Sequence, residues 1–191
     1  KAPSAKRVGI VLPPGIGGVV ANLAVIFADK VPVNLNFSLG SAAVESSIER
    51  ASIDLLLSAE KVRAKLKDFP WIPGFLDVGI ALQEIRGSKL RLLSRALALS
   101  LPCRLASSLL KIPSKGGDSE AGLLFTSGSS GMPKGVALSH RNLLSNCLQI
   151  ESIAIIPEGE TLLGNLPLFH SFGFTVTLWF ALFARIKLVT V

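Results

Sequence analysis

The chain is poor in charge. Charged residues make up 17% of its 191 residues, against about 25% in a typical soluble domain, while hydrophobic residues make up 49%. Residues 8–28 and 161–184 contain no Asp, Glu, Lys or Arg and are long enough to cross a bilayer as helices. Breakers such as Pro13, Gly15, Pro167 and Gly173 interrupt both stretches. We therefore expect buried strands and helices there, not membrane spans.

The chain has only two cysteines, Cys103 and Cys147, and no Cys/His cluster with the spacing of a zinc site. We expect both to be small buried hydrophobic residues in a reducing compartment. Residues 1–7 lead directly into a strand pattern without the cleavage site of a secretory signal. These features predict a cytoplasmic location.

Acidic residues are absent between Glu84 and Asp118, where seven lysines and arginines match the net charge of the whole chain, +7. Leucines recur at helical spacing in residues 89–101, which predicts a basic amphipathic helix. Either this helix packs on the domain with a solvated basic face, or residues 86–115 bind an anionic membrane surface or an acidic protein. The second alternative implies a peripheral protein on the inner membrane. Nucleic acid is disfavoured, because no aromatic residue lies between Phe75 and Phe125.

The densest polar motif is residues 125–135, FTSGSSGMPKG. Its glycines allow close backbone approach, its amides and hydroxyls donate hydrogen bonds, and Lys134 adds positive charge, a combination that suits a polyphosphate. A Walker A loop needs Ser or Thr after its lysine, and Gly135 stands there. A hydrolase elbow needs Gly-x-Ser-x-Gly, and GSSG at 128–131 is one residue short. On composition alone, a flexible link between two strands stays open.

Apolar runs and breakers predict a βαβ start, with strands at 7–12 and 31–35 around a helix at 19–27. Ser38 is the expected N-cap of a helix to about residue 52, and Ser58 of a charged helix through 67, after a strand at 54–57. Residues 68–87 have the pattern of a loop with a short strand at 76–78. Strands at 121–125 and 135–138 flank the phosphate loop, and Ser139 is the expected cap of a helix to about 153. The fold class is α/β, a mostly parallel sheet with covering helices and ligands at the carboxyl ends of its strands.

Two motifs resemble one known superfamily. Residues 126–142, TSGSSGMPKGVALSHRN, are similar to the signature loop of the acyl-adenylate-forming (AMP-binding) enzymes, and residues 166–175, LPLFHSFGFT, to their substrate-orienting motif. The resemblance covers about residues 8–191. Within the superfamily, the second motif looks closest to bacterial enzymes that combine 2-acylglycerophosphoethanolamine acyltransferase and acyl-(acyl carrier protein) synthetase activities.

The resemblance implies ATP- and Mg²⁺-dependent activation of a fatty acid as an acyl-adenylate, followed by transfer to acyl carrier protein or CoA, with a use in lysophospholipid reacylation. It implies no metal ligand from the protein. It assigns the β- and γ-phosphates of ATP to Thr126, Ser127, Gly128, Ser129, Ser130, Gly131 and Lys134. Lys134 and His170 are the implied catalytic residues, His170 orienting the carboxylate, with Phe172, Gly173 and Phe174 beside the acyl chain. From the residues alone, a core histidine hydrogen-bonded to backbone is the preferred interpretation of His170, and only the surrounding motif reverses that preference.

The chain starts without an initiator methionine and ends within a predicted strand, so we expect a fragment of an N-terminal AMP-binding domain, inactive alone and prone to self-association. We expect three parts: a βαβ-type part at 8–67, a basic amphipathic insert and linker at 68–117, and the phosphate loop with the substrate motif at 118–191. The alternative function is a membrane-surface or protein-interaction module built on the basic segment.

Overall fold

The computed structural model describes residues 6–114, 116–126, 132–153, 156 and 159–190, without the side chains of residues 89–91 and 95. Its strands are β1 (Arg7–Ile10), β2 (Val31–Asn34), β3 (Leu56–Ser58), β4 (Phe75–Asp77), β5 (Glu120–Thr126), β6 (Lys134–Ser139), β7 (Thr161–Leu163) and β8 (Lys187–Val189). Its helices are α1 (Ile16–Phe27), α2 (Ser41–Arg50), α3 (Glu60–Lys65), α4 (Val78–Gly87), α5 (Lys89–Leu99), α6 (Cys103–Leu109), α7 (His140–Ser152), the π-helix η1 (Gly173–Phe180) and α8 (Ala181–Phe183).

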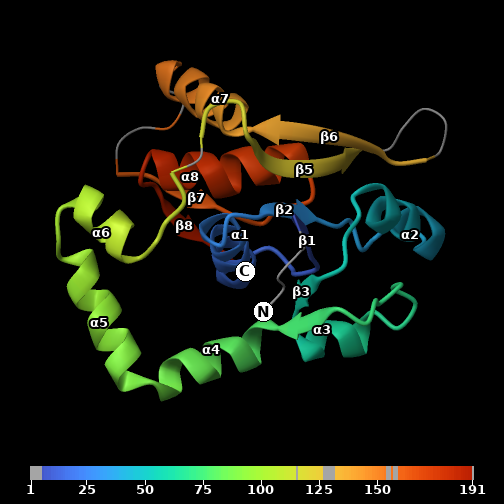
Figure 1. Ribbon diagram of the computed structural model, residues 1–191. Helices are drawn as coiled ribbons and strands as arrows, with labels where there is room; N and C mark the ends of the chain where they lie inside the picture. Colours follow the sequence, from blue (N-terminus) through green and yellow to red (C-terminus); the bar gives the residue numbers. More distant parts are fainter. Residues whose placement is uncertain (1–5, 115, 127–131, 154–155, 157–158, 191) are drawn as a thin grey trace.

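A six-stranded sheet in the order β4-β3-β1-β2-β5-β6 forms the centre of the molecule (Figure 1). Every neighbouring pair is parallel except β5 and β6, which form an antiparallel pair. The carboxyl ends of the first five strands therefore lie along one edge, where parallel α/β sheets bind ligands. A separate parallel pair, β7 and β8, lies apart from this sheet. The predicted α/β class with a mostly parallel sheet is confirmed.

Successive side chains of the central strands point to opposite faces of the sheet, so each face carries its own part of the hydrophobic core. Val8 and Ile10 of β1 pack with Ala21 and Val25 of α1 on one face. On the other face, the cluster that contains Val33 of β2 also contains side chains of α2. Because both faces of these strands are covered by helices, their sequences are continuously apolar.

A third cluster joins β5 to α7 and η1, and Phe174 at its centre is fully buried. A Cβ atom at Gly122 would lie 2.8 Å from the Phe174 ring, so glycine is the residue that lets η1 approach β5 this closely. Within the segment 161–184, Phe174, Leu178 and Phe180 are thus buried in the fold. In the described part of the chain, no helix combines the length and apolarity needed to cross a membrane.

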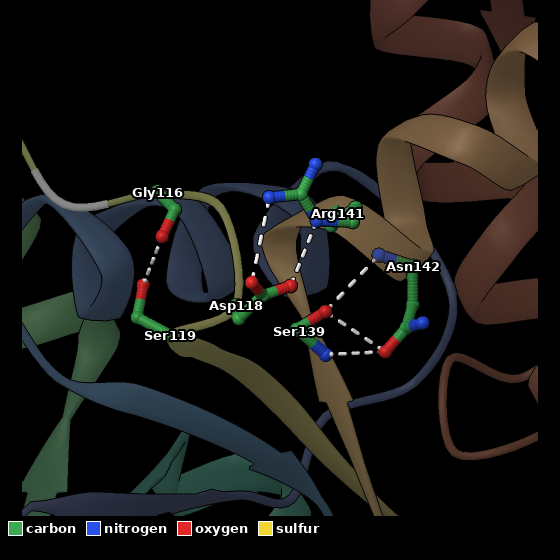
Figure 2. Close-up of polar contacts among 6 residues, drawn as sticks. All are labelled: Gly116, Asp118, Ser119, Ser139, Arg141 and Asn142. Atoms are coloured by element: carbon green, nitrogen blue, oxygen red, sulfur yellow. Dashed lines mark hydrogen bonds and ion pairs between the residues drawn. The ribbon is translucent and has the colours of Figure 1, made fainter.

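The start of α7 is fixed by polar contacts (Figure 2). The Ser139 hydroxyl accepts a hydrogen bond from the Asn142 N–H, and the Asn142 side chain accepts one from the Ser139 N–H, which completes a capping box. Arg141 pairs with Asp118 at 2.8 Å, and its N–H donates to the Gly117 carbonyl. The predicted Ser139 cap is confirmed, and the bonds of Arg141 tie the predicted linker to the first turn of α7.

Two predicted helix caps are wrong. The Ser38 hydroxyl donates to the Asn36 side chain, and α2 starts three residues later with Gly40 as its N-cap. Ser58 is buried in β3 and donates to the Val11 carbonyl at 2.6 Å. In its place, the Asp77 carboxylate accepts hydrogen bonds from N–H groups in the first turns of both α3 and α4, at Glu60 and Ile80.

Two further expectations are corrected. The predicted loop at 68–87 contains the helix α4, because its prolines all precede Asp77, which caps that helix, and Gly79 and Gly87 are accommodated within it. Cys103 was expected to be buried but is exposed at the start of α6, whereas Cys147 is buried in α7. The helices α4, α5 and α6 follow one another along an outer arc of the molecule, and we call them the helical arm (Figure 1).

Candidate functional site

The ends of the predicted phosphate loop lie at the carboxyl edge of the sheet. Thr126 at the end of β5 is paired in register with Lys134 at the start of β6. Since β5 runs parallel to β2, the loop between these residues leaves the sheet at the edge where β1, β2 and β3 end. The predicted phosphate ligands Ser127, Gly128, Ser129, Ser130 and Gly131 lie outside the described residues.

A side chain of α2 contacts the end of this loop that precedes β6. The Arg50 guanidinium, in the last turn of α2, donates to the carbonyl of Pro133 at 3.0 Å. At the base of the loop, the Thr126 hydroxyl donates a long hydrogen bond to the Lys134 carbonyl, at 3.5 Å. Arg50 therefore fixes the residue before Lys134 and adds a second positive charge beside the loop. Sequence analysis missed Arg50, which is 83 residues from Pro133.

Lys134 is exposed, and within the described residues its ammonium has no hydrogen bond or ion pair. An ammonium at a loop base without a carboxylate partner is available to an anionic ligand. Its position agrees with the phosphate-binding role that the resemblance implies.

The second motif is anchored by the two residues before His170. Leu168 is buried against α1, where a Cβ at Gly18 would lie 2.9 Å from its methyl group. Phe169 is buried edge-on against Phe37, with ring centroids 5.2 Å apart. Phe37 follows the end of β2 by three residues. This packing brings the second motif to the carboxyl end of β2, the neighbour of the strand β5 that precedes the phosphate loop.

His170 is exposed, and its ring lies 4.8 Å from that of Phe169. Its backbone N–H donates to the Pro167 carbonyl and its carbonyl accepts from the Phe174 N–H, while no side-chain hydrogen bond of His170 is found within the described residues. The alternative of a core histidine is therefore wrong. The imidazole is available at the surface of the carboxyl edge.

The three residues assigned to the acyl chain are placed differently from one another. Phe172 is exposed, Gly173 is buried against the Pro167 carbonyl, and Phe174 is buried in the core against β5. Phe172 directly precedes η1, a π-helix of eight residues, and Gly173 and Phe174 are its first two residues. π-Helical turns often occur at functional sites, because their wider turn redirects side chains.

A buried amide pair links α1 to the end of β2. Asn22 and Asn34 exchange two hydrogen bonds, of 3.0 and 2.9 Å, and Asn22 also donates to the Gly18 carbonyl at 2.8 Å. Both side chains are buried. The pair fixes α1, on which Leu168 packs, relative to the strand that leads to Phe37. Sequence analysis missed it, although an asparagine in an otherwise apolar helix was a usable signal.

An open cavity of about 560 Å³ lies at the same edge and is lined, among others, by Pro13, Phe37, Lys61 and Lys65. A second cavity, of about 520 Å³, lies at the amino ends of the strands and is lined, among others, by Lys6, Glu120 and His140. His140 is thus far from the phosphate loop along β6. Within the described residues, no group of three His, Cys, Asp or Glu side chains is placed to hold a metal ion.

At the carboxyl edge of the sheet, the Asp77 carboxylate accepts hydrogen bonds from backbone N–H groups. Hydrogen bonds from the N–H groups of Ile80 and Glu60 hold the pKa of Asp77 below its usual value; burial opposes this effect, and the Gly79 N–H lowers the pKa by a lesser amount. The ionised carboxylate therefore stabilises the starts of α3 and α4. Elsewhere, burial raises the pKa of the Cys147 thiol.

Comparison with known proteins identifies the family. The family model described as AMP-binding enzyme matches residues 2–191, and the chain belongs to this family. It is 30% identical over 167 residues to fatty acyl-CoA synthetase A of Dictyostelium discoideum, 81% of this chain and 24% of that protein. It is 27% identical over 158 residues to 4-coumarate–CoA ligase-like 9 of Oryza sativa subsp. japonica, 82% of this chain and 27% of that protein. The chain thus spans about a quarter of the length of these relatives.

Solved structures show the same fold. The N-terminal domain of FACL13 from Mycobacterium tuberculosis matches 98% of this chain with a TM-score of 0.75 and 18% identity, and the chain covers 44% of that structure. The Bacillus subtilis O-succinylbenzoate coenzyme A synthetase MenE, in complex with ATP and magnesium, matches 97% of this chain with a TM-score of 0.66 and 19% identity, and the chain covers 44% of it. The fold is therefore that of part of the N-terminal domain of AMP-binding ligases.

Proposed function

We propose that the protein to which this chain belongs activates a carboxylic acid with ATP and passes the acyl group to a thiol. A carboxylate oxygen attacks the α-phosphorus of ATP, the bond to the bridging oxygen breaks, and pyrophosphate leaves. A thiolate then attacks the carbonyl carbon of the acyl-adenylate, and AMP leaves with the electron pair of the broken C–O bond. Both steps bring anionic oxygens close together. The protein must therefore hold the reacting groups in position and neutralise their negative charge.

One observation carries the proposal: an exposed lysine without a partner in the described residues stands at the base of a Gly/Ser loop, at the carboxyl edge of a parallel sheet. In the proposed site, Lys134 pairs with the β- and γ-phosphates. Thr126, Ser127, Gly128, Ser129, Ser130 and Gly131 donate hydrogen bonds to the same oxygens. Arg50 positions the loop through the Pro133 carbonyl.

His170 has the second role. Its exposed imidazole donates a hydrogen bond to the substrate carboxylate and directs one oxygen at the α-phosphorus, while Phe172 and Gly173, with Phe174 behind them, border the acyl chain. Burial of Leu168 and Phe169 supports this role, because it fixes the backbone immediately before His170. Mg²⁺, bound together with ATP, would supply further neutralisation of the phosphate charge.

A fatty acid is the proposed substrate, and CoA or acyl carrier protein is the proposed acceptor. The relative named fatty acyl-CoA synthetase A and a structural neighbour named fatty acid AMP ligase from Legionella pneumophila support the acyl class. The apolar character of the second motif supports it as well. The choice of acyl carrier protein as acceptor, and the use in lysophospholipid reacylation, depend on the amino-acid sequence of residues 166–175.

The test is ATP–pyrophosphate exchange by the intact protein with ATP and Mg²⁺, in the presence of palmitate, 4-coumarate or no acid. We expect exchange that depends on the acid and is fastest with palmitate. CoA and acyl carrier protein, offered separately with palmitate, then identify the acceptor through thioester formation. Exchange that no carboxylate stimulates contradicts the proposed function, and exchange with 4-coumarate alone contradicts the fatty acid as substrate.

A further inference from the structure

In α5 and α6, the leucines whose side chains the structure describes are exposed, while one alanine of each helix is buried. In α5, Leu97 is 60% exposed whereas its neighbour Ala98 is 8% exposed. In α6, Leu105 is 49% exposed whereas Ala106 is 7% exposed. A helix packed on a core does the opposite, because burying leucine removes more apolar surface from water than burying alanine.

The exposed leucines continue along both helices. Leu93 and Leu97 lie one turn apart on the same side of α5, and Leu105 and Leu109 do so on α6. Further exposed leucines of the arm are Leu92, Leu99 and Leu101. An exposed apolar surface that extends over two helices marks an interaction site.

Positive charge accompanies this surface. Arg86, Arg104 and Lys111 are exposed in or beside the arm. The whole of residues 85–117 contains seven lysines and arginines and no acid. Leucines and basic residues without acids are the composition of helices that lie in the headgroup region of anionic bilayers, where leucine enters the acyl boundary and the cations meet lipid phosphates.

We propose that α5 and α6 are a docking surface for an anionic lipid bilayer. A second copy of this chain fits less well, because two arms with this charge repel each other. The contact we propose is made by the surfaces of these two helices. The inference goes beyond acyl activation and does not depend on it.

The test is co-sedimentation of the intact protein with vesicles of phosphatidylcholine alone or with about 30% phosphatidylglycerol. We expect binding to the anionic vesicles only, and release by about 0.5 M NaCl. The double variant Leu93→Gln/Leu97→Gln should weaken partitioning at least about tenfold. Its control is Leu144→Gln/Leu148→Gln, which changes two exposed leucines one turn apart on α7 and should bind as the wild type does.

Charge is tested separately. Arg86→Gln/Arg104→Gln should weaken binding to the anionic vesicles about fivefold for each charge removed. The control Lys67→Gln/Lys187→Gln removes two exposed charges outside the arm and should have a smaller effect. Equal losses in both charge variants contradict the docking surface, because they indicate attraction by net charge alone.

Three other outcomes also overturn the proposal. Loss of a dimer in the leucine variant on sizing chromatography, with vesicle binding unchanged, assigns the surface to a second copy. A lowered thermal transition in Leu93→Gln/Leu97→Gln but not in the α7 control shows that the leucines pack within the intact protein. Wild-type protein that does not bind anionic vesicles refutes the proposal directly.

Discussion

The buried pair of Asn22 and Asn34 gives a stability prediction that can be worked from the structure. Replacing Asn22 by leucine, which has a similar shape, removes both hydrogen bonds of the pair and leaves the oxygen and the amino group of Asn34 without partners in the core. Each buried polar group without a partner costs about 1–3 kcal/mol. We therefore expect Asn22→Leu to lower the free energy of unfolding by about 3 kcal/mol.

The double variant Asn22→Leu/Asn34→Leu is the matched control. It leaves no polar group of the pair unpaired, and replacing both partners with apolar groups of the same shape is close to neutral, so it should recover most of the loss. Thermal unfolding measures both variants. For a domain of this size, the single variant should unfold about 6–12 °C below the wild type. A single variant within about 1 kcal/mol of the wild type, or a double variant as damaging as two additive single changes, refutes the reasoning.

Three further predictions follow from individual side chains. His170→Ala should slow acid-dependent pyrophosphate exchange more than it raises the KM for ATP, without changing the thermal transition, since the side chain is exposed; steady-state kinetics and a melting curve check both. Gly122→Ala should destabilise the domain by about 1–3 kcal/mol, because the new Cβ would lie 2.8 Å from the Phe174 ring; a denaturant titration with an unchanged midpoint contradicts this packing. Iodoacetamide should alkylate the exposed Cys103 under native conditions and the buried Cys147, whose pKa is raised, only on unfolding; peptide mass spectrometry showing both labelled at equal rates contradicts this.

Local signals in the sequence were sufficient for part of the fold. The βαβ start was predictable because glycines and prolines at 13–18 divide one apolar run into a strand and a helix. The α7 cap was predictable because Ser139 bonds to Asn142 within one turn. The ends of the phosphate loop were predictable because apolar strands flank it on both sides. In each case the deciding contact lies within a few residues.

Contacts between distant segments explain what sequence analysis missed. Ser58 has the chemistry of a helix cap, but the neighbouring strand supplies the Val11 carbonyl, and Asp77 caps α3 from 17 residues away. In the sequence, Arg50 resembles any basic residue in the last turn of a helix. Its partner, the Pro133 carbonyl, comes close to it only through the order of strands in the sheet. An amphipathic helix was predicted at residues 89–101, but which of its sides faces solvent depends on packing such as that of Ala98 and, in the next helix, Ala106.

The central claim is that the loop ending at Lys134 holds the phosphates of ATP. The most direct test compares palmitate-dependent ATP–pyrophosphate exchange in the intact protein with that of Lys134→Ala, using Lys187→Ala, another exposed strand lysine, as control. We predict that Lys134→Ala lowers exchange about 10²–10³-fold with an unchanged thermal transition, because a charge-assisted phosphate contact is lost while no contact within the described residues is broken. The control should exchange as the wild type does. Exchange by Lys134→Ala within about twofold of the wild type contradicts the assignment of this loop.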